Sequence, residues 1–270
     1  MTRISEIIKN FNSISIPEYV LYEAYLENRN LIQTWVEYRK SNYVIPEELK
    51  YFGWITDRDA SKNTPVMSWI QYRNYELIRN KSLDLRGDIP EELKYPNWQT
   101  DNNNGGETPL MYWIQCRKNE PIPEELKYPG WQTDKDNYGN TSIMIWIEYR
   151  NYEPVPEELK YPGWQTDKNG WDGTPLMCWI AYRNYEPVPE ELKYPSWQTD
   201  KDNYGNTSLM RWTRDRTFEP IPEELFYPGW QTDINNRGET SLMIWTRYRT
   251  SEPIPNELLE SQSGIPEELN

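Results

Sequence analysis

Hydrophobic residues follow a helical pattern in a segment that recurs along the chain. In one copy, Ile143, Trp146 and Ile147 fall at positions i, i+3 and i+4, which share one face of an α-helix. Thr141 precedes them and suits a helix N-cap, because its hydroxyl oxygen can accept a hydrogen bond from the first turn. The pattern predicts a helix of about three turns over Thr141–Asn151.

A shorter apolar pattern follows, and prolines limit it at both ends. Val155 and Leu159 are its apolar members; Pro156 can begin a helix and Pro162 discourages its continuation. The prediction is a helix of barely more than one turn, which must dock on the longer helix because it cannot form alone. Gly139 lies in the polar turn before the longer helix, where it is free to adopt a positive φ.

The two patterns belong to a repeat marked by the residues Trp-Gln-Thr-Asp. This motif returns at a constant interval, beginning at Trp98, Trp131, Trp164, Trp197 and Trp230. A fixed period of this size indicates one supersecondary unit stacked on copies of itself. The fold class predicted is therefore an all-α solenoid of helix–turn–short-helix repeats.

The repeats define the expected organisation of the chain. Six units are predicted over residues 54–255, with a capping region and a degenerate repeat over residues 1–53 and a C-terminal cap over residues 256–270. The first unit is longer than the others, since the interval from Trp54 to Trp98 exceeds the interval between later copies. Its insertion lies within residues 77–88, and we expect it to project and to contact a partner through Leu83 and Leu85.

Residues 136–168 resemble a divergent ankyrin repeat. The consensus of that family opens with Asp-x-x-Gly-x-Thr-Pro-Leu-His and has the same period as this chain. Asp136, Gly139 and Thr141 match it, and a later copy reads Thr174-Pro175-Leu176-Met177. The resemblance covers residues 54–255. It implies an ankyrin-like solenoid that binds a partner through its turn tips and the exposed side of the first helix.

Three departures from that family affect the expected geometry. Methionine replaces the family's histidine, tryptophan replaces a small residue in the first helix, and prolines shorten the second helix. A leucine-rich-repeat solenoid is a rival fold, because Ile-Pro-x-Glu-Leu also occurs there. The chain lacks the strand segment of that family, and the period of that family is usually shorter.

Two recurring residue types are expected to build the scaffold rather than a site. Most of the 14 tryptophans return at fixed positions among leucine and isoleucine, which favours core packing. An arginine follows each helical tryptophan and a glutamate comes three residues later, as in Arg150 and Glu153, so we expect an ion-pair ladder. Trp171 is the exception, because it lies in a turn where exposure is expected.

Charge and composition narrow the function classes. The net charge of −14 favours a partner with a basic surface and disfavours direct binding of nucleic acid, which needs clustered lysine and arginine. The two cysteines, Cys116 and Cys178, lack metal-ligand spacing and suit a reducing compartment, such as the cytoplasm of the source cell or of a host cell. We expect no membrane-spanning segment, no metal and no cofactor.

Catalysis is not expected from this composition. The chain has no histidine, so histidine-dependent triads and imidazole acid–base chemistry are excluded. The paired glutamates lie at helix starts, where acidic residues interact favourably with the helix dipole. An EF-hand reading of the acidic turn at Asp134 fails, because its twelfth position is Ile145 rather than glutamate.

Positions that differ between repeats are the candidates for partner contact. They fall in the turn tips, in the residue before the helical tryptophan and in the insertion. The predicted partner-binding residues are Arg58, Asn103, Tyr112, Tyr138, Ile145, Trp171, Tyr204, Arg211, Leu83 and Leu85.

The function predicted is a non-enzymatic protein–protein interaction scaffold, an adaptor or inhibitor that is monomeric or self-associates weakly. One alternative is an acidic decoy that mimics nucleic acid and blocks a nucleic-acid-binding or defence protein. Another is a module that binds a glycan on its aromatic side chains. A structural unit that stacks on itself is a further alternative.

Overall fold

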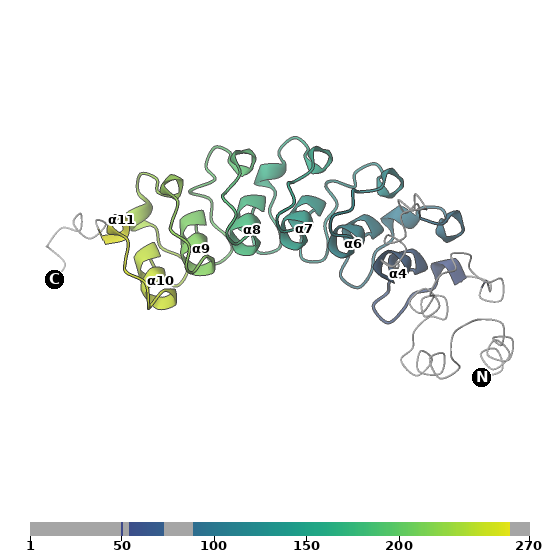
Figure 1. The fold of residues 1–270 in the computed structure, drawn as a ribbon, viewed down its shortest axis with the longest axis horizontal. Coiled ribbons are helices and arrows are strands. Elements are labelled where there is room, and N and C mark those ends of the chain that lie inside the picture. Colours follow the sequence, from purple (N-terminus) through teal and green to yellow (C-terminus); the bar gives the residue numbers. More distant parts are fainter. Residues whose placement is uncertain (1–49, 51–53, 73–88, 260–270) are drawn as a thin grey trace. The chain divides into compact units, whose positions relative to one another are not determined.

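The structure, a computed structural model, describes Lys50, residues 54–72 and residues 89–259 (Figure 1). The described residues form helices, turns and loops, with no strand among them. Consecutive α-helices pack against their neighbours, which gives the all-α helical repeat solenoid predicted from the period. The insertion with Leu83 and Leu85, and most of the two terminal regions, lie outside the described residues.

The chain divides into two compact units between Asn137 and Tyr138. In the first unit, α4 (Pro65–Tyr72) packs on α6 (Pro109–Cys116). Single 3₁₀ turns accompany them: η3 (Trp54–Thr56), η4 (Glu91–Leu93), η5 (Trp98–Thr100) and η6 (Glu124–Leu126).

The second unit contains four successive repeats whose long helices pack in chain order. These are α7 (Ser142–Tyr149), α8 (Pro175–Tyr182), α9 (Ser208–Asp215) and α10 (Ser241–Tyr248). Figure 1 shows them side by side, coloured from teal to yellow. The unit also has the 3₁₀ turns η7 (Glu157–Leu159), η8 (Trp164–Thr166), η9 (Glu190–Leu192), η10 (Glu223–Leu225) and η11 (Trp230–Thr232), and ends in α11 (Asn256–Leu259).

The long helices begin where the sequence predicts. The hydroxyl oxygens of Thr108, Thr174 and Thr207 each accept a hydrogen bond from the backbone N–H three residues later, at 3.4 Å. This is the N-cap bond that satisfies an otherwise unpaired donor of the first turn. The helix predicted over Thr141–Asn151 forms as α7, shorter by one residue at its start and two at its end.

The second helix of each repeat is only a 3₁₀ turn, as its prolines predict. In η7, Pro156 stands in an extended conformation before the turn, and Leu159 is fully buried. A second turn that the sequence did not predict forms at Trp-Gln-Thr, as in η8, after a left-handed Gly163. The hydroxyl of Tyr161 donates to Asp167 across that turn. The same tyrosine–aspartate bond recurs at 2.6 Å in Tyr128–Asp134 and Tyr194–Asp200.

The helical tryptophans form the core and also anchor the chain after the helix. Trp146 and Trp179 are almost fully buried, and each indole N–H donates to a proline carbonyl eight residues later at 3.1 Å. Burial of the indole removes a large apolar area from water, while its N–H keeps a partner. The prediction that tryptophan builds the core is therefore confirmed for the recurring helical position.

The arginine–glutamate ladder exists and links neighbouring repeats. Arg183 is fully buried, lies over the Trp179 ring at 4.6 Å and pairs with Glu186 at 3.3 Å. Its guanidinium also donates to the carbonyls of Ile147 at 2.8 Å and Trp146 at 3.3 Å in the preceding repeat. Both carbonyls lie in the last turn of α7, where helical partners run out, and an arginine from the next repeat caps them; the Trp146 carbonyl also accepts the Arg150 N–H at 3.0 Å.

The same arrangement occurs in the later repeats of the second unit. Arg216 donates to Ile180 and Trp179, and Arg249 donates to Thr213 and Trp212. Burial lowers the pKa of Arg183, Arg216 and Arg249, and the paired glutamates oppose that effect. The buried charges are thus compensated by both an ion pair and carbonyl oxygens.

Candidate functional site

The turn tips of the second unit are joined by backbone hydrogen bonds from repeat to repeat. Gly170 N–H donates to the carbonyl of Tyr138 at 2.6 Å, and Asn203 N–H donates to that of Trp171 at 2.9 Å. Asn236 N–H donates in the same way to the Tyr204 carbonyl at 2.8 Å. The bonds fix the spacing of successive tips, so side chains carried there are presented by a rigid frame.

Three consecutive tips carry aromatic rings that face solvent. Tyr138 is 57% exposed, Trp171 43% and Tyr204 50%. Tyr138 and Trp171 stack with their centroids 5.6 Å apart and their planes within 12°. We call Tyr138, Trp171 and Tyr204 the turn-tip row. Exposed aromatic side chains on a rigid frame are typical of protein-binding surfaces, because they supply contact area at low entropic cost.

Glycine is required where successive tips approach each other. Gly139 has a φ of +77°, and a Cβ there would lie 2.6 Å from the backbone nitrogen of Gly170. Gly170 in turn leaves room for the Tyr138 carbonyl, which would lie 2.7 Å from a Cβ. The close approach of the tips therefore depends on the absence of side chains at these two positions.

A pocket of about 300 Å³ lies beside Tyr204, between the repeats of α9 and α10. Its lining combines cations, amides and aromatic rings: Tyr204, Asn206, Arg211, Arg214, Asn235, Asn236, Arg237, Glu239, Ile244 and Tyr248. Three of these residues are arginines, in a chain whose net charge is −14. We call this feature the arginine pocket.

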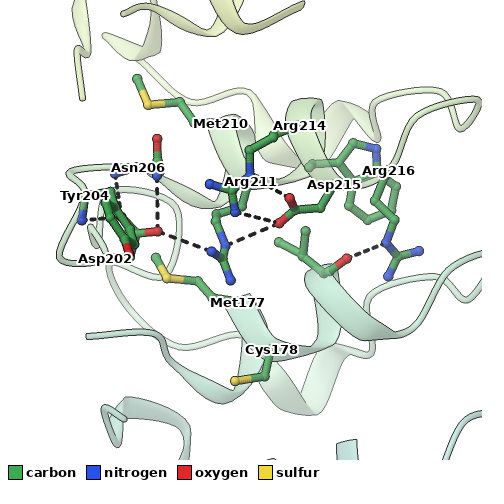
Figure 2. Close-up of polar contacts among 12 residues, drawn as sticks. Met177, Cys178, Asp202, Tyr204, Asn206, Met210, Arg211, Arg214, Asp215 and Arg216 are labelled. Atoms are coloured by element: carbon green, nitrogen blue, oxygen red, sulfur yellow. Dashed lines mark hydrogen bonds and ion pairs between the residues drawn. The ribbon is translucent and has the colours of Figure 1, made fainter. Parts of the chain in front are cut away.

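Ion pairs hold two of its arginines in place, as Figure 2 shows. Arg211 lies between Asp202 and Asp215, with a nitrogen–oxygen distance of 3.5 Å to each. Arg214 makes two bonds to Asp215, at 2.6 and 3.0 Å. Arg237 is exposed and makes no ion pair among the described residues. The pocket thus presents one unpaired cation, Arg237, which can bind a carboxylate or phosphate, beside two guanidinium groups whose charges are matched by Asp202 and Asp215.

The residues predicted in the first unit have structural partners. Arg58 donates to the carbonyl of Asn102 at 2.7 Å and pairs with Asp101 at 3.0 Å, so it ties two turns together. The Tyr112 hydroxyl donates to Gln71 at 3.0 Å, and its ring is half-buried. Both side chains keep some exposed surface.

Two predicted residues are not on the surface, and the expectation that they are exposed was wrong. Ile145 is 1% exposed, because its face of α7 is covered by packing between repeats. Asn103 is buried, and its Oδ1 accepts the backbone N–H groups of Gly105 at 2.9 Å and Glu107 at 3.1 Å. The sequence carried a signal for this role, since asparagine or aspartate stands at the equivalent position of all six repeats: Asp59, Asn103, Asp136, Asn169, Asp202 and Asn235.

Sequence reasoning missed the arginine pocket. Arg214, Arg237, Glu239 and Tyr248 come from two neighbouring repeats and were not singled out. Arginine replaces neutral or acidic residues of the earlier repeats at the positions of Arg214 and Arg237. A comparison of each position across all repeats would have found this local reversal of charge.

Both cysteine thiols lie in the described residues, and neither is activated. Burial raises the pKa of the Cys116 thiol to about 11 and that of Cys178 to about 12, so neither is an activated nucleophile. Within the described residues, cysteine and carboxylate side chains form no group able to hold a metal ion. No helix in the described part of the chain is long and apolar enough to cross a membrane.

No protein-family model matches the chain, and no curated protein matches its sequence. The geometry of the repeats is therefore the basis for assigning a function.

Proposed function

We propose that the chain is a non-enzymatic, ankyrin-like array that binds a protein partner through the turn-tip row and the arginine pocket. The observation that carries the proposal is the set of three consecutive exposed rings on hydrogen-bonded turns, at 57, 43 and 50% exposure. Rings that only filled the core would be covered, as the helical tryptophans are. Their exposure at one recurring position supports a role in recognition.

The ankyrin-like part of the proposal is supported by local geometry. The turn, the threonine N-cap and the following proline or serine lead into the first helix as the resemblance implies. The second helix differs, because it is reduced to a single 3₁₀ turn. The binding surface proposed is the one on the turn side, which this difference leaves intact.

The pocket refines the expected chemistry of the partner. Net charge alone favours a basic partner surface. Beside Tyr204, however, Arg237 is an exposed cation next to two oriented arginines. The proposed partner therefore has a mainly basic surface and places one acidic side chain in the arginine pocket. There, a guanidinium can bind the carboxylate with two hydrogen bonds.

The experiment is affinity capture from lysates of the source or host cell, followed by binding measurements on the purified partner. A triple variant, Tyr138→Ser, Trp171→Ser and Tyr204→Ser, is expected to lose the partner and to keep the native melting temperature. A matched control changes two exposed apolar side chains outside the proposed site, Met243 and Leu259, to serine, and is expected to keep the partner. A partner retained by the turn-tip variant would contradict the proposal.

Salt dependence tests the alternative of a nucleic-acid-mimicking decoy. For the proposed site, we expect affinity to fall only moderately between low and physiological salt, because stacked rings supply part of it. The decoy would be favoured if nucleic-acid-binding proteins were recovered and their affinity fell steeply over that range. Their affinity would also be unchanged by the ring substitutions.

A further inference from the structure

A second row of exposed aromatic rings lies between the long helix and the following 3₁₀ turn of each repeat. Tyr152 is 74% exposed, Tyr185 71% and Phe218 73%, which makes them more exposed than the turn-tip rings. Their sequence spacing equals the period of the repeat, so they occupy one equivalent position in three successive repeats of the second unit. We call Tyr152, Tyr185 and Phe218 the interhelix row.

The backbone at these residues is left-handed, which aromatic residues rarely adopt. Their φ angles are +66°, +64° and +76°. Glycine, asparagine and aspartate are the residues that tolerate this region, and a bulky side chain there is an outlier. The equivalent residue in the repeat of α6 is Asn119, with a φ of +63°. The fold therefore accepts the expected residue at this position and does not require a ring.

Hydrogen bonds from the next repeat fix the row in place. The N–H groups of Tyr152 and Tyr185 donate to the carboxylates of Glu186 and Glu219, both at 3.0 Å. Phe218 N–H donates likewise to Glu252 at 3.1 Å. Each of these glutamates also pairs with a buried arginine, as Glu186 does with Arg183. The rings are thus attached at the spacing of the repeats themselves.

That spacing matches the pitch of a polyproline II helix. Packed helices lie about 8–10 Å apart, so the backbone positions that carry successive rings are separated by roughly this distance. A polyproline II helix has three residues per turn and rises about 3.1 Å per residue, which gives about 9 Å per turn. One ring can therefore contact each turn of such a ligand. Exposed prolines, Pro154 and Pro187, lie two residues after the rings and stiffen this edge.

The size and charge of the row favour a short peptide over a folded partner. Three rings of this exposure present roughly 400–500 Å², whereas a stable interface needs about 800 Å² from each partner. A second copy of the chain would therefore not be held by the row alone. The net charge of −14 favours a ligand that carries lysine or arginine.

We propose that the interhelix row binds a proline-rich, basic segment of a partner protein in the polyproline II conformation. This surface is separate from the turn-tip row and does not depend on the function proposed for it. The Tyr152 and Tyr185 hydroxyls can donate to the carbonyls of the ligand, which a polyproline II helix leaves without internal partners. Recognition thus needs rings at a regular interval and few ordered ligand residues.

The test uses the full chain and a fluorescein-labelled decapeptide of proline with one arginine at each end. We expect saturable binding by fluorescence polarisation, and no binding of a glycine–serine peptide with the same arginines. The triple variant Tyr152→Asn, Tyr185→Asn and Phe218→Asn should lose binding, and each single change should weaken it about tenfold. The turn-tip variant, with serine at Tyr138, Trp171 and Tyr204, should bind the peptide as the native chain does.

Asparagine is chosen because the chain itself has it at Asn119, so the variant keeps the left-handed backbone and its melting temperature should not fall. Equal binding of the proline peptide by the native chain and the triple variant would overturn the proposal. So would binding of an oligosaccharide in place of the peptide, or a dimer in light scattering that the triple variant abolishes. These results do not test the function proposed for the turn-tip row, which the capture experiment tests separately.

Discussion

The buried and the exposed aromatic residues of the second unit follow different rules. The helical tryptophans recur in each repeat and are buried; Trp146, Trp179 and Trp212 each lie beside an arginine and donate to a proline carbonyl. The exposed rings occupy positions where other repeats have small or polar residues, such as Gly105 and Asn119. Recurrence therefore marks the residues that hold the array together. Exposure together with variation marks the residues that are available for recognition.

Removal of a ladder arginine should have the largest effect on stability. In Arg183→Met, the carbonyls of Ile147 and Trp146 lose a buried donor and Glu186 loses its ion-pair partner. We expect the free energy of unfolding to fall by about 3–5 kcal/mol, because groups that stay buried are left uncompensated. Urea unfolding followed by tryptophan fluorescence measures the change.

The matched control for that experiment is Arg237→Met, at an exposed arginine without an ion pair among the described residues. Its effect on unfolding should stay within about 0.5 kcal/mol. Similar losses in the two variants would show that the ladder contributes no more than an ordinary surface charge, and would remove the distinction between recurring and variable positions.

A smaller effect is expected where two turn tips touch. Gly139 and Gly163 both have positive φ angles, but only at Gly139 would a Cβ meet a neighbouring backbone nitrogen, at 2.6 Å. Gly163→Ala should cost about 1–2 kcal/mol from the left-handed backbone alone. Gly139→Ala should cost about 1 kcal/mol more, since a contact must open as well. Thermal unfolding compares the two, and equal losses would mean that the tips are not held at the spacing described.

The smallest effect at neutral pH concerns the recurring tyrosine–aspartate pairs. Burial, and then the bond to the neighbouring aspartate, raise the pKa of Tyr95, Tyr128, Tyr161, Tyr194 and Tyr227 well above the ordinary value. The folded-state pKa is raised, so the stabilisation is complete below the unfolded value of about 10 and is lost as the pH rises above it.

These tyrosines should accordingly add no pH dependence to the urea midpoint between pH 8 and about 10. Above that pH, their ionisation should lower the midpoint. The double variant Tyr128→Phe and Tyr194→Phe should decline less steeply, because two of the titrating groups are gone. An unchanged slope in that variant would show that these hydroxyls do not couple to folding.

The fold was predictable because the period and the local chemistry agree. A repeat of constant length, threonine before a helix and proline at both ends of the short turn each constrain the backbone directly. The second 3₁₀ turn at Trp-Gln-Thr was missed. It follows a left-handed residue, Asn97 or Gly163, and is accompanied by a tyrosine–aspartate bond across six residues. Such a bond has no periodic signature of its own.

The site was only partly predictable, because variation between repeats has two causes. Tyr138, Trp171 and Tyr204 vary and are exposed, as expected. Ile145 also varies, yet it is covered by the neighbouring repeat, where the side chain must suit local packing. A single sequence does not separate these causes, since both leave the backbone pattern unchanged. The interhelix row was missed for another reason. Its exposure depends on a left-handed φ, which tyrosine and phenylalanine rarely adopt.

The capping arginines also imply an order in which the repeats are completed during synthesis. The carbonyl of Ile147 is satisfied by Arg183, which lies 36 residues later in the chain, and Ile180 and Arg216 have the same separation. During synthesis, therefore, each of these helices is made before the arginine that completes its end. The contacts at the end of one repeat form only after the long helix of the next repeat has been synthesised.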